Sequence, residues 1–221
     1  MKASLLPITG IGGLPHQSVE DALEYSLKFD IPFLPELPHL DGDMTTLSKN
    51  SCLEKFLEHT QSQNIRKVQY PSPEINQKIV IRDFKNTKTF IDCPLIHDTE
   101  NISSIVTGRG LHSCALKSFE EIKDLGISHL SFDARLITDS PENFLKELIR
   151  NDITPVVGII STHDGKVSRV ENFTKWKKAL SMYSMSCWLS TACGLSNFTE
   201  KDCDHALEEL RSARSEILQL S

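Results

Sequence analysis

The sequence lacks the features that mark several classes of protein. It contains no stretch of about 18 apolar residues, the minimum for a membrane-spanning helix, and its first apolar run is too short for a secretory signal peptide. It also contains no block of basic residues, because its formal net charge of -6 arises from charges of both signs spread along the chain. We therefore expect a cytoplasmic protein that binds neither a membrane nor nucleic acid.

The sequence also shows no internal repeat, low-complexity tract or linker. Its 221 residues suffice to bury a full core, so we expect residues 1–221 to form a single domain. Its six cysteines stand at irregular spacing and do not resemble a disulfide framework. In a reducing compartment such cysteines favour metal binding or simple burial.

What the sequence does contain is an alternation of short apolar runs with helical patterns. The helical patterns are SVEDALEYSLKF, SFEEIKDL, SPENFLKELIRN and VENFTKWKKALSMY, and Ser18 with Asp21 three residues later has the pattern of a helix cap. The runs predicted as strands are Leu6–Ile11, Ile31–Leu34, Arg66–Tyr70, Lys88–Ile91, Gly110–Cys114, His129–Phe132, Pro155–Ile160 and Cys187–Thr191.

This alternation predicts an α/β fold, a closed (β/α)8 barrel of the TIM type. The segment from Pro71 to Arg109 must hold two connections without a clear amphipathic helix. We therefore expect the barrel to be trimmed or distorted around its third to fifth strands. A doubly wound open sheet is the alternative.

Chemistry-bearing residues stand where three of these strands end. His112 and Cys114 are two apart and so share one face of a strand, and in a barrel the carboxyl ends of the strands surround the active site. Asp133 ends the next strand and Cys193 follows the last one. These ligand types suit tetrahedral zinc. The alternative is a core histidine, two buried cysteines, and an aspartate that caps a helix.

Five motifs, in order, resemble the zinc-binding catalytic barrel of cobalamin-independent methionine synthase and its relatives in the uroporphyrinogen decarboxylase superfamily. They are TGIGGLPH at 9–16, IDCP at 91–94, LHSC at 111–114, LSFDA at 130–134 and ACGL at 192–195. The intervals of 19 residues from Cys114 to Asp133 and of 60 from Asp133 to Cys193 are also similar to those of the family.

The resemblance implies a role for each matching residue. Asp92 would receive the α-ammonium group of homocysteine, with Glu36 as a second acid, and His163 would deliver a proton during methyl transfer. Alternatively, Asp92 is a cap at a strand end, Glu36 is a solvated loop residue, and His163 is an exposed loop residue. The carboxylate of homocysteine would lie on the backbone of a loop formed by Ile11, Gly12 and Gly13. The alternative is that these glycines simply form a tight turn. Zn²⁺ would be bound by His112, Cys114, Asp133 and Cys193.

The sequence also departs from the family. Asp133 replaces the usual glutamate, Cys93 replaces the glutamate of the I-D-E-P motif, and only 20 residues separate Asp92 from His112. We also expect no counterpart of the amino-terminal half that helps the long enzymes to hold folate. We therefore expect a zinc-dependent homocysteine S-methyltransferase that takes its methyl group from a corrinoid, such as one on a carrier protein, or from another non-folate donor.

Two other functions are compatible with the sequence. A degenerate barrel could bind zinc or a thiol amino acid without turnover, as a sensor, carrier or accessory subunit. Decarboxylation of a porphyrin is less compatible, because a tetra-acid substrate calls for several arginines and the motifs carry almost none.

Overall fold

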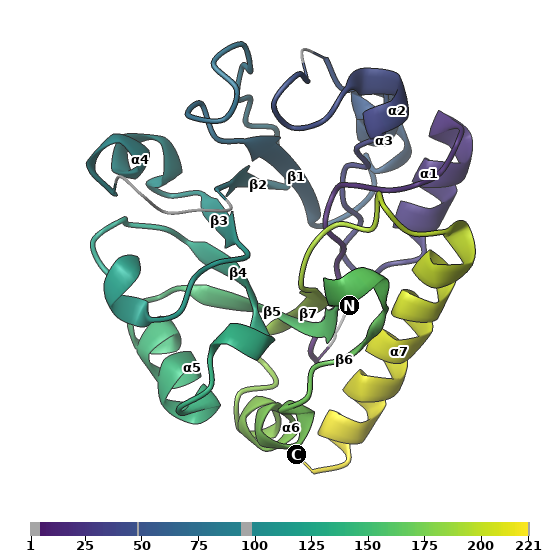
Figure 1. The fold of residues 1–221 in the computed structure, drawn as a ribbon. Coiled ribbons are helices and arrows are strands. Elements are labelled where there is room, and N and C mark those ends of the chain that lie inside the picture. Colours follow the sequence, from purple (N-terminus) through teal and green to yellow (C-terminus); the bar gives the residue numbers. More distant parts are fainter. Residues whose placement is uncertain (1–4, 48, 94–98, 221) are drawn as a thin grey trace.

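A computed structural model of the chain describes residues 5–47, 49–93 and 99–220. The fold is mixed α/β, with strands gathered at the centre and helices around them (Figure 1). The strands form one seven-stranded sheet. They are β1 (Arg66–Pro71), β2 (Thr87–Asp92), β3 (Gly110–Ser113), β4 (His129–Asp133), β5 (Thr154–Ser161), β6 (Ser168–Arg169) and β7 (Trp188–Thr191).

The sheet is mostly parallel. Strands β1 to β5 pair in sequence order and β7 lies parallel to β5, whereas the short β6 runs antiparallel to β5. The register sets Asp92 opposite both Pro71 and His112, and it sets Asp133 opposite Gly158. The carboxyl ends of neighbouring strands therefore meet at one edge, as the sequence predicts for its candidate site residues.

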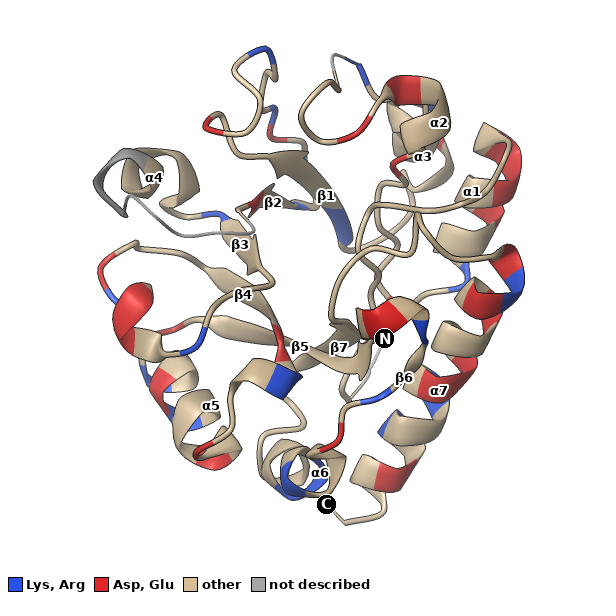
Figure 2. Cartoon of the chain, in the orientation of Figure 1, with Lys and Arg blue, Asp and Glu red and all other residues tan. Residues whose placement is uncertain are grey.

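The described α-helices surround this sheet. They are α1 (Val19–Leu27), α2 (Pro38–Asp41), α3 (Leu53–His59), α4 (Thr99–Val106), α5 (Pro141–Arg150), α6 (Phe173–Met182) and α7 (Glu200–Leu218). Side-chain caps begin three of them, because Ser18, Ser140 and Thr199 each accept a backbone N–H from the first turn. Charges of both signs are intermixed on α5 and α7 (Figure 2). None of the described helices has the length and apolar character needed to cross a bilayer.

The first two predicted strands differ from the prediction. Leu6–Ile11 and Ile31–Leu34 form no strand, and the assigned sheet is not closed. Isolated parallel bridges occur instead between the following residues: Ile8 and Leu189, Thr9 and Ile31, Gly13 and Glu36, and Phe33 and Lys67.

Proline explains why these two segments do not form continuous ladders. Pro7 lies in the first segment and Pro32 in the second, and a proline has no N–H to donate to a neighbouring strand. Both prolines still accept hydrogen bonds through their carbonyl groups, from Leu189 and Lys67 respectively. Pairing is therefore reduced to single bridges.

The distortion predicted around the third to fifth strands lies elsewhere. Those runs became β1, β2 and β3, which are continuously paired, and the interruption falls on the two N-terminal segments instead. No helix occurs between β1 and β2, as expected, whereas α4 lies between β2 and β3. The pattern SFEEIKDL forms only the 3-10 turn η1 (Phe119–Glu121), and Gly126, with φ of 63°, turns the chain soon after it.

The two faces of the sheet differ in what they bury. The face toward the helices carries a large apolar core that includes Val68, Leu111 and Leu130. The opposite face carries a small separate cluster of Ile31, Phe90, Val156 and Trp188. Because side chains alternate along a strand, Asp92 and His112 stand on this second face, above the small cluster.

His129 is a buried member of this second face, and its titration should affect stability. Its ring packs against Phe90 and Trp188, and burial lowers its pKa to about 4. Unfolded histidine titrates near 6.5, so stability is intact above that pH and is lost as the pH falls toward 4. The loss amounts to up to about 3 kcal/mol. Denaturant unfolding between pH 7 and 4 should show it, and His129→Phe should remove this part of the pH dependence. An equally steep profile in the variant would contradict the prediction.

Candidate metal centre

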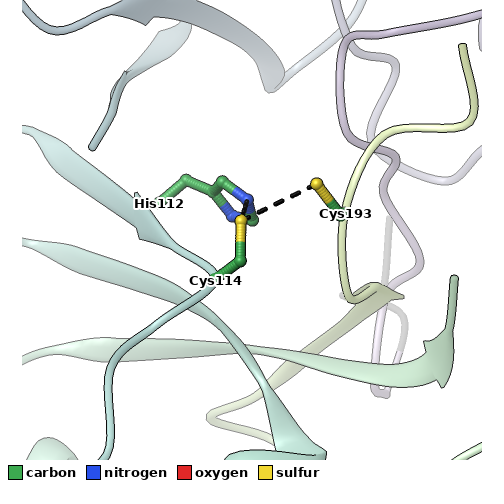
Figure 3. Close-up of side chains that lie close together, drawn as sticks. All are labelled: His112, Cys114 and Cys193. Atoms are coloured by element: carbon green, nitrogen blue, oxygen red, sulfur yellow. Dashed lines mark hydrogen bonds between the residues drawn. The ribbon is translucent and has the colours of Figure 1, made fainter. Parts of the chain in front are cut away.

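Three of the predicted zinc ligands lie together at the carboxyl-terminal edge of the sheet. His112 is on β3, Cys114 follows β3 directly, and Cys193 follows β7. Figure 3 shows their side chains pointing toward one another. Cys114 Sγ lies 3.6 Å from His112 Nε2 and 3.7 Å from Cys193 Sγ. Among the described residues, these three ligand atoms lie within 4.8 Å of one another.

These distances fit a tetrahedral zinc ion. With Zn–S bonds of about 2.3 Å and a Zn–N bond of about 2.0 to 2.1 Å, two sulfur ligands stand about 3.8 Å apart and a sulfur and a nitrogen about 3.6 Å apart. The observed 3.7 and 3.6 Å are close to both values. Three protein ligands leave one tetrahedral position for a further ligand, which is the arrangement of catalytic zinc sites.

The two thiols of the cluster interact as a pair. The hydrogen bond between the two sulfur atoms lowers the pKa of Cys193. The same bond, together with burial, raises the pKa of Cys114. This pairing favours the loss of one proton from the two thiols, which suits the binding of a cation.

Ser131 orients the imidazole of the cluster. It stands opposite His112 in the β3–β4 register, and its Oγ lies 2.8 Å from His112 Nδ1. When the hydroxyl accepts the Nδ1 proton, Nε2 is unprotonated and faces Cys114, as metal ligation requires. Sequence analysis missed Ser131, although its position two residues before Asp133 on the same face was a usable signal.

Asp133 lies outside this cluster. Its carboxylate accepts a hydrogen bond from the backbone N–H of Arg135 at 2.8 Å. It also lies 3.3 Å from Nε and from Nη2 of the Arg135 side chain. It thereby caps the short 3-10 turn η2 (Ala134–Leu136). Helix capping is the alternative role that the sequence analysis gave for Asp133.

Cys93 also lies outside the cluster. It is buried, burial raises the pKa of its thiol to about 11, and its backbone N–H donates to the His112 carbonyl. No disulfide joins any of the six cysteines. Pro94, the last residue of the IDCP motif, is outside the described residues.

The predicted substrate loop lies directly against the cluster. The Gly13 carbonyl accepts the Leu195 N–H at 2.6 Å, and a Cβ on Gly194 would lie 3.2 Å from backbone atoms of Gly13. Gly12 packs under the Glu36 side chain, where a Cβ would lie 2.7 Å from the carboxyl group. Because Gly12 and Gly194 lack side chains, the loop at 11–13 can approach both Glu36 and the segment that holds Cys193.

Two acidic groups stand next to the cluster in a poorly solvated region. Burial raises the pKa of Asp92. Burial, and secondarily the Asp92 charge, raise the pKa of Glu36 to about 8. One oxygen of Asp92, Oδ1, is buried without a hydrogen-bond partner, and an unpartnered buried acceptor is costly unless a ligand satisfies it.

His163, another predicted site residue, does not join the cluster of His112, Cys114 and Cys193. It follows β5, its side chain is 56% exposed, and its Nε2 lies 3.2 Å from Asp164. No described member of the cluster hydrogen-bonds to it.

A cavity of about 420 Å³ borders Gln69 and Tyr70, and none of its described lining residues belongs to the cluster.

The fold has a counterpart among solved structures. A B12-independent methionine synthase from Shewanella sp. W3-18-1, solved in complex with selenomethionine, superposes with a TM-score of 0.64 over 98% of both chains. The likeness is one of fold. Sequence identity is only 16%, and no family model and no curated protein matches the chain.

Proposed function

We propose that this protein is a zinc-dependent S-methyltransferase that methylates homocysteine to methionine. The observation that carries the proposal is the spacing of His112, Cys114 and Cys193, which suits tetrahedral zinc with one position open. The fold likeness to a methionine synthase supports it. Zinc, when bound, would stabilise a ligand thiol as its nucleophilic thiolate near neutral pH.

We further propose that the sheet is a distorted (β/α)8 barrel. The single bridges of Ile8 and Thr9 connect β7 to the segment at Ile31, and the bridge from Phe33 to Lys67 connects that segment to β1. This order of segments is the one that a closed barrel requires. The site would then occupy the mouth of the barrel, where parallel strands end.

The surrounding residues would bind and orient an amino acid. Asp92 supplies an unpartnered carboxylate oxygen for the α-ammonium group, and Glu36 provides a second acid nearby. The glycine loop at 11–13 would hold the carboxylate through backbone N–H groups. In this arrangement the ligand thiol reaches the cysteine cluster. We assign His163 to proton transfer. With a corrinoid donor the proton in question is the one that the ligand thiol loses, and the exposed His163 side chain would turn toward the ligand to accept it.

We propose a corrinoid as the methyl donor. Cys193 is exposed and Cys114 is half-buried, so the metal position is accessible to a large carrier. Transfer requires the methyl carbon to approach the sulfur to within about 3 to 3.5 Å, so that the carbon–sulfur bond forms as the cobalt–carbon bond breaks and leaves the corrinoid as Co(I). A corrinoid bound at the edge of the sheet could make that approach without its own enclosed pocket.

A donor screen tests this function. Zinc-loaded protein should form methionine from homocysteine and a methylated corrinoid, and little or none from methyltetrahydrofolate. Asp92→Ala and Cys193→Ser should each lose nearly all of this activity, because the first removes the ammonium contact and the second a metal ligand. Product is measured by mass spectrometry. Turnover with the folate alone would refute the donor. Inactivity with every donor, in folded and zinc-loaded protein, would favour a non-catalytic binder instead.

A further inference from the structure

A row of buried polar side chains runs beneath the two acids of the site. Lys67 Nζ donates to the Gly10 carbonyl and to Gln69 Oε1, both at 2.9 Å. Gln69 Nε2 in turn donates to Asp92 Oδ2 at 2.7 Å. Lys67, Gln69 and Asp92 are only 1%, 4% and 7% exposed. The row therefore connects the glycine-rich loop to Asp92 through the interior of the protein.

Strand geometry places these side chains. Lys67 and Gln69 are two apart on β1 and so share a face, while Val68 and Tyr70 belong to the core on the other face. Gln69 is opposite Phe90 in the β1–β2 register, which puts it diagonal to Asp92. Diagonal neighbours on adjacent strands are within reach of long side chains. The contact is thus fixed by register.

The chemistry of Lys67 fixes the orientation of the Gln69 amide. The lysine nitrogen donates to the amide oxygen as well as to the Gly10 carbonyl, which leaves the amide NH₂ to face Asp92. The flipped amide would set donor against donor at Lys67 and acceptor against acceptor at Asp92. One carboxylate oxygen is consequently held in place, and the other, Oδ1, is buried without a partner.

We propose that Lys67 and Gln69 are positioning residues that hold Asp92 with one oxygen occupied and the other directed at the primary ammonium group of an amino-acid ligand. This inference rests on the proposed function, and it assigns ammonium recognition to a three-residue unit. Among the described residues no ion pair joins Lys67 to Asp92. An ammonium paired directly with Asp92 would compete with that of the ligand, whereas an intervening amide holds the carboxylate without occupying both oxygens.

The charges of this region agree with such a role. Lys67 interacts electrostatically with both Asp92 and Glu36, and its Nζ also lies 4.8 Å from the centre of the Phe90 ring. Burial lowers the pKa of Lys67 to about 7, so this lysine is only partly charged near neutral pH. A ligand ammonium would bring a positive charge beside Asp92 in a poorly solvated region, where its attraction to a carboxylate is strong.

A comparison of two thiols tests the proposal. Homocysteine and 4-mercaptobutyrate differ only in the amino group, so the ratio of their dissociation constants reports ammonium recognition. Calorimetry on zinc-loaded protein should show tighter binding of homocysteine. Lys67→Met and Gln69→Leu should each reduce the preference by about tenfold or more, with the dissociation constant of 4-mercaptobutyrate nearly unchanged. A merely structural role would weaken both thiols alike.

Arg66→Met provides the matched control. Arg66 precedes Lys67 on β1 and is also a buried cation, but its guanidinium donates to Leu57, Thr60 and Thr87, away from the site. This variant should keep the full preference for homocysteine. If Lys67→Met does not fold, Gln69→Leu still decides the matter, because it removes both bonds of the amide and keeps the bond from Lys67 to Gly10.

The outcomes separate this inference from the proposed function. Wild-type protein that binds both thiols equally, or neither, would overturn the assignment of Asp92 and this inference with it. Wild-type protein that prefers homocysteine, together with variants that keep that preference, would overturn only the roles of Lys67 and Gln69. A preference lost in both variants and kept in Arg66→Met would support the positioning unit.

Discussion

Cys114→Ser and Cys193→Ser should each lose most of their bound zinc. We expect wild-type protein to bind about one zinc per chain, and each substitution to weaken the affinity by more than about 100-fold. The reason is that removing a residue that only orients a zinc ligand already costs 10- to 100-fold, and these two sulfurs are ligands themselves in the proposed site. Competition with a chromophoric chelator at pH 7 would measure it.

Two further variants make this measurement specific. Cys203→Ser alters a buried cysteine of α7 that lies outside the cluster, so it should keep its zinc. Asp133→Asn should also keep it to within about tenfold, because an asparagine can still accept the Arg135 N–H. A loss in Asp133→Asn as large as in the cysteine variants would show that this residue is the fourth ligand that the family resemblance implies. Full retention in both cysteine variants would refute the site.

Gly158→Ala should destabilise the protein by about 3 kcal/mol, at the upper end of the range for overpacked cores. A Cβ at this position would lie 2.6 Å from Ala192 Cα and 2.7 Å from the Phe132 carbonyl oxygen. Both are backbone atoms of flanking segments, since β5 pairs with β4 and β7 here. Neither can move aside as a flexible side chain would. Thermal unfolding should show a decrease in Tm of about 6 to 12 °C.

The same variant should also affect the metal centre, because Ala192 directly precedes Cys193. Separation of β5 from the end of β7 would displace this ligand, so zinc affinity should fall together with stability. Gly13→Ala is the control, since its Cβ would meet nothing closer than 3.4 Å and its stability should change by less than about 1 kcal/mol. A Tm for Gly158→Ala equal to that of Gly13→Ala would contradict the packing argument.

The sequence by itself determined most of the local elements, although SFEEIKDL formed only a 3-10 turn. Ser18 and Ser140 cap the helices that their patterns predict, because a cap and an amphipathic period act within a few residues. Six predicted strands also formed, with ends within a few residues of the prediction. The His112–Cys114 pair belongs here too, since alternation along one strand directs both side chains to the same face.

Pairing between segments was decided only by the tertiary structure. The prolines of the N-terminal segments were visible in the sequence, but whether their missing N–H groups interrupt a ladder depends on which neighbour each strand meets. The inward direction of Lys67 and Gln69 depends on the register between β1 and β2. A buried lysine cannot be recognised from composition, because its burial requires partners that lie far away in the chain.

The metal centre shows both contributions. The sequence identified ligand types and order, but it could not measure the distance from Cys114 to Cys193, which are 79 residues apart. Nor could it decide whether the Asp133 carboxylate turns toward the cysteines or back to Arg135, since both contacts are compatible with a strand end. Long-range distances follow from how the sheet packs, and competition between a local cap and a distant ligand is settled only in the folded protein.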